Sequence, residues 1–376
     1  ASITRRTLAG FRKDVRMNVW CYKHKFTVGQ LVKAKVLKND LSLNKDEIRD
    51  CDIVDVLRVN PQLFIDDVAN TDFWKDKTGY KHNMNGSKKL KFNAIVGNPP
   101  YQQETLGAGR QAIPLYNLFT SVARNLNPHY VSMIMPSRWF AGGMGLDDFR
   151  DSMRVDRHLR YIHDFTNAKV CFPQISISGG ISYFLWDVDY AGPCTFTNTT
   201  NGKNSTSQRF LDEFPIVVRY NEAISILRKV HNKAEKTLDT IISPLMPFGL
   251  STNVRGRSES SETDTIKLLA SNSITYISPK EITKGQDLIP KWKVFMSKMS
   301  AEHAGEPDKN GKFSVFTKTT QVAPPNEVCT HSYFVIGAFN IEQEAINTLN
   351  YLRTRFVRFI VMATLSAVNL SKLVFF

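Results

Sequence analysis

The sequence predicts an open α/β sheet, followed by a second region of mixed α+β structure. Short apolar runs alternate with segments of helical spacing, in the order strand, helix, strand, helix, strand. After Tyr190 the composition shifts to Thr, Asn, Ser and Gly, and the later part is punctuated by Gly and Pro. We therefore expect one domain over residues 1–190, a linker or surface loop over residues 191–215, and a second domain over residues 216–376.

Apolar spacing predicts the elements of the first domain. The run over residues 92–97 reads as a buried parallel strand, and residues 115–126 place their apolar side chains on one helical face. Further elements are expected as a helix over 1–11, a helix over 46–59, a strand over 130–135, a flexible loop over 142–145, a helix over 146–153, and strands over 159–165 and 181–187.

The second domain has weaker patterns. Residues 195–207 suit a surface loop, and residues 216–234 have the spacing of a helix. Residues 249–316 predict short, irregular segments, residues 342–359 predict one amphipathic helix, and residues 373–376 predict an apolar strand. The first residue is not Met, and both ends fall inside expected elements, so we expect a piece cut from a longer protein.

The charge balance favours a polyanionic partner. Lys and Arg number 49 against 35 Asp and Glu, which gives a net charge of +14. Nucleic acid is the commonest such partner, and an ordinary basic protein is the alternative.

The cysteine pattern and the hydropathy exclude several classes of protein. Five widely spaced cysteines with no CxxC pair predict neither a disulfide framework nor a zinc ribbon, and they suit a reducing cytoplasm. Cys21 and His24 form a lone C-x-x-H, so we expect no metal site. No apolar run reaches about 18 residues, so no membrane insertion is expected.

Asn98-Pro99-Pro100-Tyr101 carries the chemistry, because it follows a predicted strand at the edge where open α/β sheets bind ligands. The exocyclic amine of adenine is a weak nucleophile. The Asn98 side-chain oxygen and the Pro99 carbonyl would accept its two N–H groups, and Tyr101 would stack on the base. The two prolines stiffen the loop. The alternative is a simple strand-ending turn.

The segment FNAIVGNPPY, residues 92–101, resembles motif IV of amino-methyltransferases that act on DNA adenine. Residues 115–119 resemble the helix that follows, residues 130–139 resemble motif VI, and residues 164–186 resemble motifs VII and VIII. The motif order resembles the gamma class, and the best likeness is to Eco57I-type restriction-modification methylases. This resemblance implies a Rossmann-like methyltransferase open sheet with an incomplete N-terminal half, followed by a target-recognition domain. Residues 274–278, 291–294 and 354–359 resemble segments of such a domain.

The resemblance also implies site residues and partners. Phe172, in a Phe-Pro turn, would pack on the face of a flipped adenine opposite Tyr101, although an ordinary core aromatic is the alternative. S-adenosylmethionine would be the cofactor, but no glycine-rich cofactor turn precedes Asn98, and Asp66 and Asp67, with Asp72, are only weak candidates for a contact. Double-stranded DNA would be the partner, with a restriction endonuclease domain or subunit outside this chain. The candidate DNA contacts are Arg255, Arg257, Lys291, Lys293, Arg355 and Arg358.

Three functions remain open at this point. The first is site-specific adenine-N6 methylation of DNA in a restriction-modification system of a bacterial or archaeal cell. The second is a DNA-binding recognition fragment or inactive homologue without methyl transfer. The third keeps the chemistry of the loop and changes the substrate to RNA adenine or protein glutamine.

Overall fold

The computed structural model describes residues 25–40, 42–69, 91–103, 113–175, 177–233, 236–271, 273–300, 315–365 and 370–376. Its contacts divide the chain into two compact units, residues 1–131 and 132–376. The division therefore falls inside the expected first domain and not near residue 190. The helix expected over residues 1–11, the Cys21–His24 pair and Asp72 lie outside the described residues.

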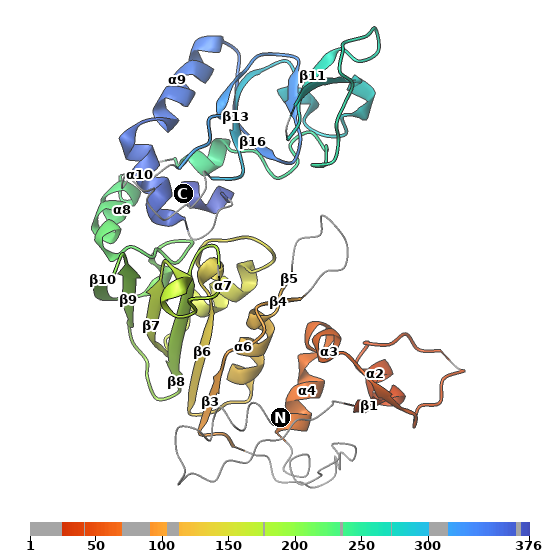
Figure 1. The fold of residues 1–376 in the computed structure, drawn as a ribbon, viewed down its shortest axis with the longest axis vertical. Helices are drawn as coiled ribbons and strands as arrows, with labels where there is room; N and C mark the ends of the chain where they lie inside the picture. The colour runs from red at the N-terminus through yellow and green to blue at the C-terminus, as the bar shows by residue number, and fades with distance from the viewer. Residues whose placement is uncertain are drawn as a thin grey trace. The chain divides into compact units, whose positions relative to one another are not determined.

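The first unit contains short strands and four described helices (Figure 1). In chain order these elements are β1 (Lys25–Thr27), α2 (Val28–Lys33), β2 (Ile48–Asp50), α3 (Ile53–Val59), α4 (Pro61–Val68), β3 (Ala94–Gly97), β4 (Gln102–Gln103), β5 (Ile113–Pro114) and α6 (Tyr116–Asn125). β1 pairs with β2, and β4 pairs with β5, both antiparallel.

Local sequence signals explain where these helices begin. α3 starts after Asp52, whose carboxylate accepts the Val54 N–H at 2.9 Å, and α4 starts with Pro61 at its first turn. Buried side chains of α3, α4 and α6 (Leu57, Ile65 and Val122) share one apolar core. α6 confirms the predicted helix over 115–126. The helix predicted over 46–59 is wrong in its first half, because residues 48–50 pair with β1 as a strand.

β3 confirms the predicted strand but not its predicted burial. Its residues alternate between exposed and half-buried, and Val96 is 76% exposed. β3 is the last strand of a six-stranded sheet, so it has a described neighbouring strand on one side only. On that side, the Tyr130 N–H donates to the Asn93 carbonyl at 2.9 Å.

The main sheet is mixed and six-stranded, in the order β10-β9-β7-β8-β6-β3 (Figure 1). β7 pairs antiparallel with β8 and parallel with β9, and β9 pairs antiparallel with β10. The sheet and the elements around it are β6 (Tyr130–Pro136), η1 (Ser137–Phe140), α7 (Asp147–Arg154), β7 (Leu159–Phe165), η2 (Ala168–Val170), β8 (Ile181–Asp187), β9 (Cys194–Thr200), β10 (Lys203–Arg209) and η3 (Leu211–Glu213).

Alternation along the strands places large apolar side chains on one face of this sheet. Ile162 lies opposite Phe184 on β8 and Phe196 on β9, and all three are buried. Trp139 of η1 packs edge-on against Phe149 of α7, with ring centroids 5.8 Å apart. β6, α7, β7 and β8 confirm the elements predicted from apolar spacing.

The linker expected over residues 191–215 is wrong, because residues 194–209 form a β-hairpin that extends the sheet. Asn201 and Gly202 connect its strands with φ values of 51° and 73°. Two successive residues in the left-handed region are typical of the type I′ turn, which Asn-Gly favours. Thr and Ser, which indicated a loop, here occupy the strands.

Three later predictions also need correction. The helix expected over 216–234 is shorter, since η4 (Asn221–Ala223) and α8 (Ile224–His231) follow a buried, non-helical run of β-branched side chains at residues 216–218. The single helix expected over 342–359 is two helices, α9 (Glu342–Leu352) and α10 (Arg355–Thr364), and Thr354 caps the second by accepting the Val357 N–H at 3.3 Å. The terminal strand is instead a 3₁₀ turn, η8 (Lys372–Phe375).

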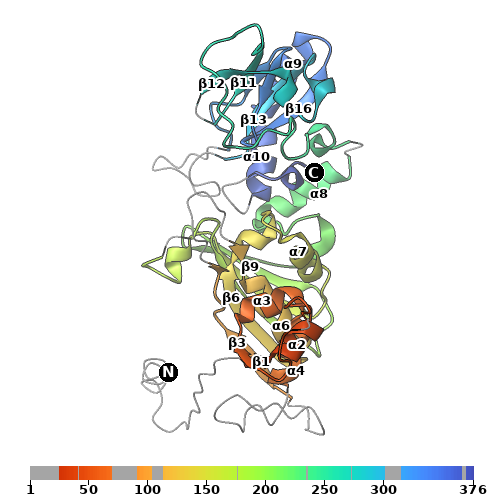
Figure 2. The same ribbon diagram turned by 90° about the vertical axis from the view of Figure 1, so that its right-hand side faces the viewer.

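The C-terminal part confirms the expected mixture of short strands and helices. Its remaining elements are η5 (Leu238–Ile241), β11 (Ile266–Leu269), β12 (Ile274–Ile277), η6 (Pro279–Glu281), η7 (Gln286–Leu288), β13 (Trp292–Ser297), β14 (Gln321–Ala323), β15 (Glu327–Cys329) and β16 (Tyr333–Phe339). They form two three-stranded sheets, β12-β11-β15 and β14-β13-β16, and α9 packs across the second (Figure 2).

One apolar core of the second unit joins the segments that follow η1 and η3 to the last helices. It joins Ala141, Phe214 and Ile216 to Val357 of α10 and to Phe375 of η8. This shared core is why residues near 215 do not separate two domains. Among the described residues, no helix is long and apolar enough to cross a membrane.

Candidate active site

The loop Asn98–Tyr101 leaves β3 with its first side chain turned to solvent. Asn98 and Pro100 are exposed, Pro99 is buried and Tyr101 is half-buried. The Tyr101 carbonyl accepts the Leu115 N–H at 3.1 Å, which fastens the loop to the start of α6. The backbone is therefore held while the Asn98 amide stays accessible.

The residues after the loop are held a second time. Gln102 lies opposite Pro114, and Gln103 lies opposite Ile113, in the β4–β5 pair. The Gln103 side-chain oxygen also accepts a hydrogen bond from Arg58 Nη2 of α3 at 2.7 Å. Two helices of the first unit, α6 and α3, thus anchor the two sides of this segment.

Phe172 lies in a turned segment between β7 and β8. The Phe172 N–H donates to the Ala168 carbonyl at 2.9 Å, and the Phe172 carbonyl accepts the Ile175 N–H at 3.0 Å. Its side chain is half-buried, in contrast to fully buried core aromatics such as Phe184. Asn98–Tyr101 belongs to the first unit and Phe172 to the second, so the proposed sandwich of Tyr101 and Phe172 stays a prediction.

A buried ionic network lies beneath the segment that carries Phe172. The Asp164 carboxylate accepts hydrogen bonds from Arg219 Nε at 2.9 Å and Nη2 at 2.8 Å, from Asn198 Nδ2 at 2.7 Å and from Ser137 Oγ at 2.6 Å. The Asp164 and Arg219 side chains are 0% and 1% exposed. Such a bidentate, fully hydrogen-bonded pair offsets the cost of burying both charges.

The same network holds the end of the segment, where it re-enters the sheet at Gly179-Gly180. Arg219 Nη2 also donates to the Gly179 carbonyl at 2.7 Å, and the Ser137 N–H donates to the Gly180 carbonyl at 3.1 Å. Gly180 has φ +80°, and a Cβ atom there would lie 2.2 Å from the Phe165 carbonyl oxygen. The position therefore requires glycine, both for its backbone angle and for space.

Four residues of this network escaped the sequence-based prediction: Ser137, Asp164, Asn198 and Arg219. One signal was present. Asp164 lies two residues after the buried Ile162, on the same buried face of β7. An unpaired carboxylate there would be strongly unfavourable. That position predicts a buried cationic partner, but it does not say which of the chain's 49 Lys and Arg residues provides it.

Aromatic side chains line the opposite face of β7 and β8, next to the same segment. The His163 ring stacks on Phe165 at 4.2 Å, and its two nitrogens contact the Tyr183 hydroxyl at 3.1 Å and Thr199 Oγ1 at 2.7 Å. Burial lowers the pKa of His163 and raises the pKa of Cys171. Burial, followed by the neighbouring Tyr161 and Cys171, raises the pKa of Tyr183. These shifts favour the neutral forms of His163, Cys171 and Tyr183.

Asp66 and Asp67 do not fit a cofactor contact. Both lie within α4 and not at the end of a sheet strand or in the solvated loop expected as the alternative. The Asp66 carboxylate accepts the Gln62 amide at 2.6 Å, one helical turn away, and Asp67 is only 2% exposed. We therefore assign neither residue to a cofactor.

Five of the six candidate DNA contacts are exposed or half-buried, and the sixth, Lys293, is fully buried. Arg255, Arg355 and Arg358 are exposed, and Arg255 Nη1 donates to the Thr252 carbonyl at 2.6 Å. Lys291 donates to the Asn340 side chain. Arg257 is exposed but ion-paired with Glu281 at 2.5 Å and with Asp264 at 3.6 Å.

Lys293 is a correction to that set. Its side chain is fully buried, and Nζ donates to the carbonyls of Lys291 at 2.8 Å and Pro324 at 3.1 Å. Burial lowers the pKa of Lys293 to about 8. A side chain held in this way is not available to a phosphate, so Lys293 stabilises the sheet around β13.

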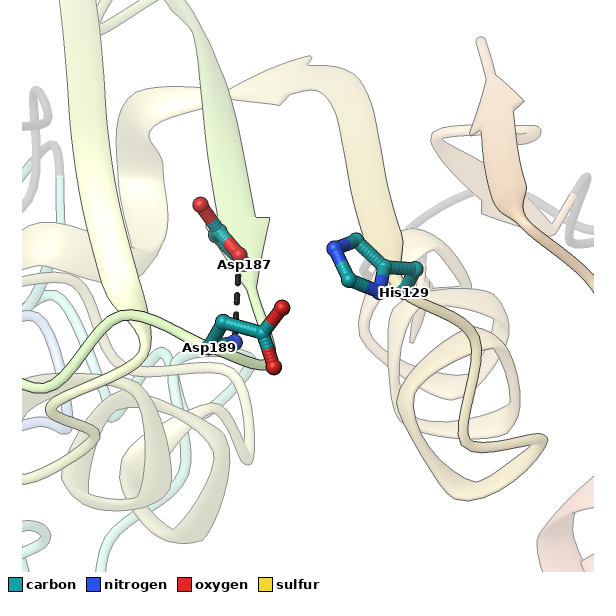
Figure 3. A group of neighbouring side chains, drawn as sticks. All are labelled: His129, Asp187 and Asp189. Carbon is teal, nitrogen blue, oxygen red and sulfur yellow. Dashed lines mark hydrogen bonds between the residues drawn. The ribbon is translucent and has the colours of Figure 1, made fainter.

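Two carboxylates mark the end of β8. Asp187 Oδ1 accepts the Asp189 N–H at 3.1 Å (Figure 3), and Asp187 Oδ2 accepts Arg160 Nη1 at 2.9 Å. Asp187 is buried, and its pairing with Arg160 explains how its charge is accommodated. His129, also drawn in Figure 3, belongs to the first unit.

The site elements coincide with a family match. Residues 2–172 match the Eco57I restriction-modification methylase family. The matched segment contains β3, the Asn98–Tyr101 loop, α6, β6 and β7, and it ends at Phe172. The Eco57I-type likeness inferred from residues 92–101 is thereby confirmed.

One curated relative and two solved structures are also similar. An "uncharacterized adenine-specific methylase" of Mycoplasma pneumoniae is 30% identical over 159 residues, which are 40% of this chain and 37% of the relative. The chain thus aligns with well under half the length of that protein. The type IIG restriction endonuclease BpuSI aligns with a TM-score of 0.31 at 11% identity, over 74% of this chain and 46% of its own. The type IIL restriction-modification enzyme MmeI, in complex with DNA, aligns with a TM-score of 0.37 at 8% identity, over 74% and 45%.

Proposed function

We propose that this chain carries the base-handling and DNA-binding parts of a site-specific DNA adenine-N6 methyltransferase of a restriction-modification system. The observation that carries the proposal is the Asn98–Tyr101 loop. It follows β3 directly, exposes the Asn98 amide and lies inside the segment that matches the methylase family.

The loop would act on the amine of an adenine. The lone pair of that amine is delocalised into the ring, so the nitrogen is a poor nucleophile. Two acceptors, the Asn98 side-chain oxygen and the Pro99 carbonyl, would bind both N–H groups and stabilise the positive charge that develops on nitrogen. Fixed acceptors lower the barrier because they need no reorganisation during the reaction.

Stacking would hold the base in place. An adenine within a duplex cannot reach this loop, so it must rotate out of the stack. Tyr101 would stack on one face of the base and Phe172 on the other. Phe172 suits this role because its ring is half-buried on a segment fixed by the Asp164–Arg219 network.

S-adenosylmethionine is the methyl donor that the family implies. Because Asp66 and Asp67 do not fit a contact with it, we assign its site to no described residue. Duplex DNA would be the substrate, with the exposed Arg255, Arg355 and Arg358 among the contacts to phosphate. A restriction endonuclease partner is part of the same proposal and lies outside this chain.

Substitution of Asn98 tests the proposal. We expect Asn98→Ala to lower the rate of methyl transfer to duplex DNA by about 100-fold or more, as when one catalytic hydrogen-bonding group is removed, with little change in DNA affinity. The matched control is Asn93→Ala, because Asn93 is an exposed asparagine immediately before the same strand. Equal transfer rates for the wild type and Asn98→Ala would contradict the proposed role of the loop.

A further inference from the structure

Lys298 and His331 form a pair of basic side chains in the C-terminal part of the second unit. Lys298 directly follows β13, and His331 lies between β15 and β16. Lys298 Nζ and His331 Nε2 are 2.7 Å apart. Backbone hydrogen bonds fix both positions: the Lys298 N–H donates to the Ser332 carbonyl at 2.9 Å, and the His331 N–H donates to the Leu250 carbonyl at 2.9 Å.

The contact fixes the protonation state of the histidine. An ammonium group can only donate, so His331 Nε2 must accept and therefore carries no proton. The ring proton then lies on Nδ1, which contacts Thr252 Oγ1 at 3.4 Å. The pair thus holds one positive charge, because two would repel strongly at this distance.

The described surroundings of the pair provide hydroxyl groups. Ser332 Oγ, on the residue after His331, lies 2.7 Å from Ser271 Oγ. Within the described ranges, neither Lys298 nor His331 has an ion pair with a carboxylate. Two half-buried basic groups beside hydroxyls, with no acidic partner in the part of the chain that the structure describes, form an arrangement that an anion would complete.

We propose that Lys298 and His331 bind one phosphate group of a nucleic-acid backbone. This inference rests on the proposed function, because it names DNA as the source of the phosphate. An anion that contacts both side chains would allow both to be charged at once. Binding would therefore take up a proton at His331, and affinity would rise as the pH falls.

The pKa shifts agree with this geometry. Burial lowers the pKa of Lys298 to about 8, and burial, followed by the charge of Lys298, lowers the pKa of His331. Binding of an anion opposes both shifts. Between the pKa of free His331 and its higher value in the complex, the complex binds more protons than the free protein, so acidification strengthens binding.

Other titratable groups on the neighbouring elements do not supply this behaviour. Cys329 and Tyr333 flank His331 in the chain, and burial raises the pKa of both, so both stay neutral at pH 6 to about 8. Arg255 lies beyond Thr252, and the exposed Lys372 lies near the Lys298 backbone. A pH dependence of DNA affinity that disappears in His331→Gln therefore arises from His331.

The test measures the affinity of the 376-residue chain for duplex DNA across salt concentration, at pH 6.0 and 7.5. The variants are Lys298→Gln and His331→Gln, and Lys284→Gln, an exposed lysine of the same region, is the control. We expect Lys298→Gln to weaken binding several-fold at both pH values and to reduce the salt slope by about 1. We expect wild-type binding to tighten at pH 6.0 by roughly threefold more than binding by His331→Gln, since one proton per complex contributes up to tenfold per pH unit.

Two further measurements complete the experiment: a titration of the protein with inorganic phosphate and an assay of methyl transfer. Unchanged affinity, salt slope and pH response in both variants, beside a wild type that binds and methylates DNA, would overturn this inference and leave the proposed function standing. A His331 ring resonance that shifts with inorganic phosphate but not with DNA would overturn the assignment to nucleic acid. A pH-coupled DNA affinity without any Asn98-dependent methyl transfer would support this site and contradict the proposed function. Absence of DNA binding by the wild type would overturn both.

Discussion

The two segments proposed to hold the adenine are built in different ways. Asn98–Tyr101 follows an exposed strand and is held through backbone and side-chain contacts to α6 and α3. The segment with Phe172 stands on a fully buried Asp164–Arg219 pair that also holds Gly179. The first segment presents its polar group to the solvent, and the second is held by polar groups that are buried.

This difference separates residues that would bind the substrate from residues that hold a segment rigid. A group that must bind a substrate amine has to be accessible, so its environment contributes little to stability. A group that positions a stacking ring acts through rigidity, and buried charges with complete hydrogen bonding provide it. We therefore expect substitutions in the first segment to change the reaction and substitutions in the second to change stability first.

The largest expected effect on stability is that of Asp164→Ala. It would leave the Arg219 guanidinium buried without its carboxylate, which costs about 3–5 kcal/mol in the free energy of unfolding. Chemical denaturation measures this change. The control is Asp151→Ala, because Asp151 pairs with Arg154 on the surface of α7 and is 59% exposed. A loss of stability no greater than that of the control would remove the contrast between the two segments.

A second substitution sharpens the comparison at the end of the Phe172 segment. Gly180→Ala would place a Cβ atom 2.2 Å from the Phe165 carbonyl, at φ +80°, so we expect a loss of at least about 2 kcal/mol. The control is Gly202→Ala in the β9–β10 turn, which has a similar φ of +73° but no atom within 4 Å of the added Cβ. That variant should lose about 1 kcal/mol, for its backbone angle alone. Equal losses for the two variants would show that the close approach at Gly180 does not matter.

The smallest expected effect concerns the ring itself. Phe172→Ala removes a stacking surface worth about 1–3 kcal/mol per base, so binding of DNA with an extruded adenine should weaken by that amount. Fluorescence of 2-aminopurine at the target position reports the extruded base. Ile175→Ala is the control, because Ile175 is exposed in the same turn. If both variants extrude the base as the wild type does, Phe172 has no stacking role.

The sequence predicted best those elements whose apolar spacing is long and regular. β6, β7 and β8, with α6 and α7, lie where spacing placed them, because burial of one face dictates both the pattern and the element. The β9–β10 hairpin was missed because its strands are rich in Thr and Ser, which also suit loops. Asn201-Gly202 was the local signal that could have corrected this interpretation.

Long-range partners could not be predicted in this way. The helix expected over 216–234 begins eight residues late, since residues 216–218 are buried in the core without helical structure and Arg219 reaches Asp164, 55 positions earlier in the chain. For the candidate site, the motif identified Asn98–Tyr101, but nothing local indicated that Lys293 is buried or that Lys298 meets His331. Those facts depend on how distant strands pair.

Identification of the methylated atom tests the central claim most directly. Duplex DNA is incubated with the protein and isotopically labelled S-adenosylmethionine, digested to nucleosides and analysed by mass spectrometry. We expect the label on N6 of deoxyadenosine, lost in Asn98→Ala and kept in Asn93→Ala. Label on a cytosine, or label on adenine that persists in Asn98→Ala, would contradict the account.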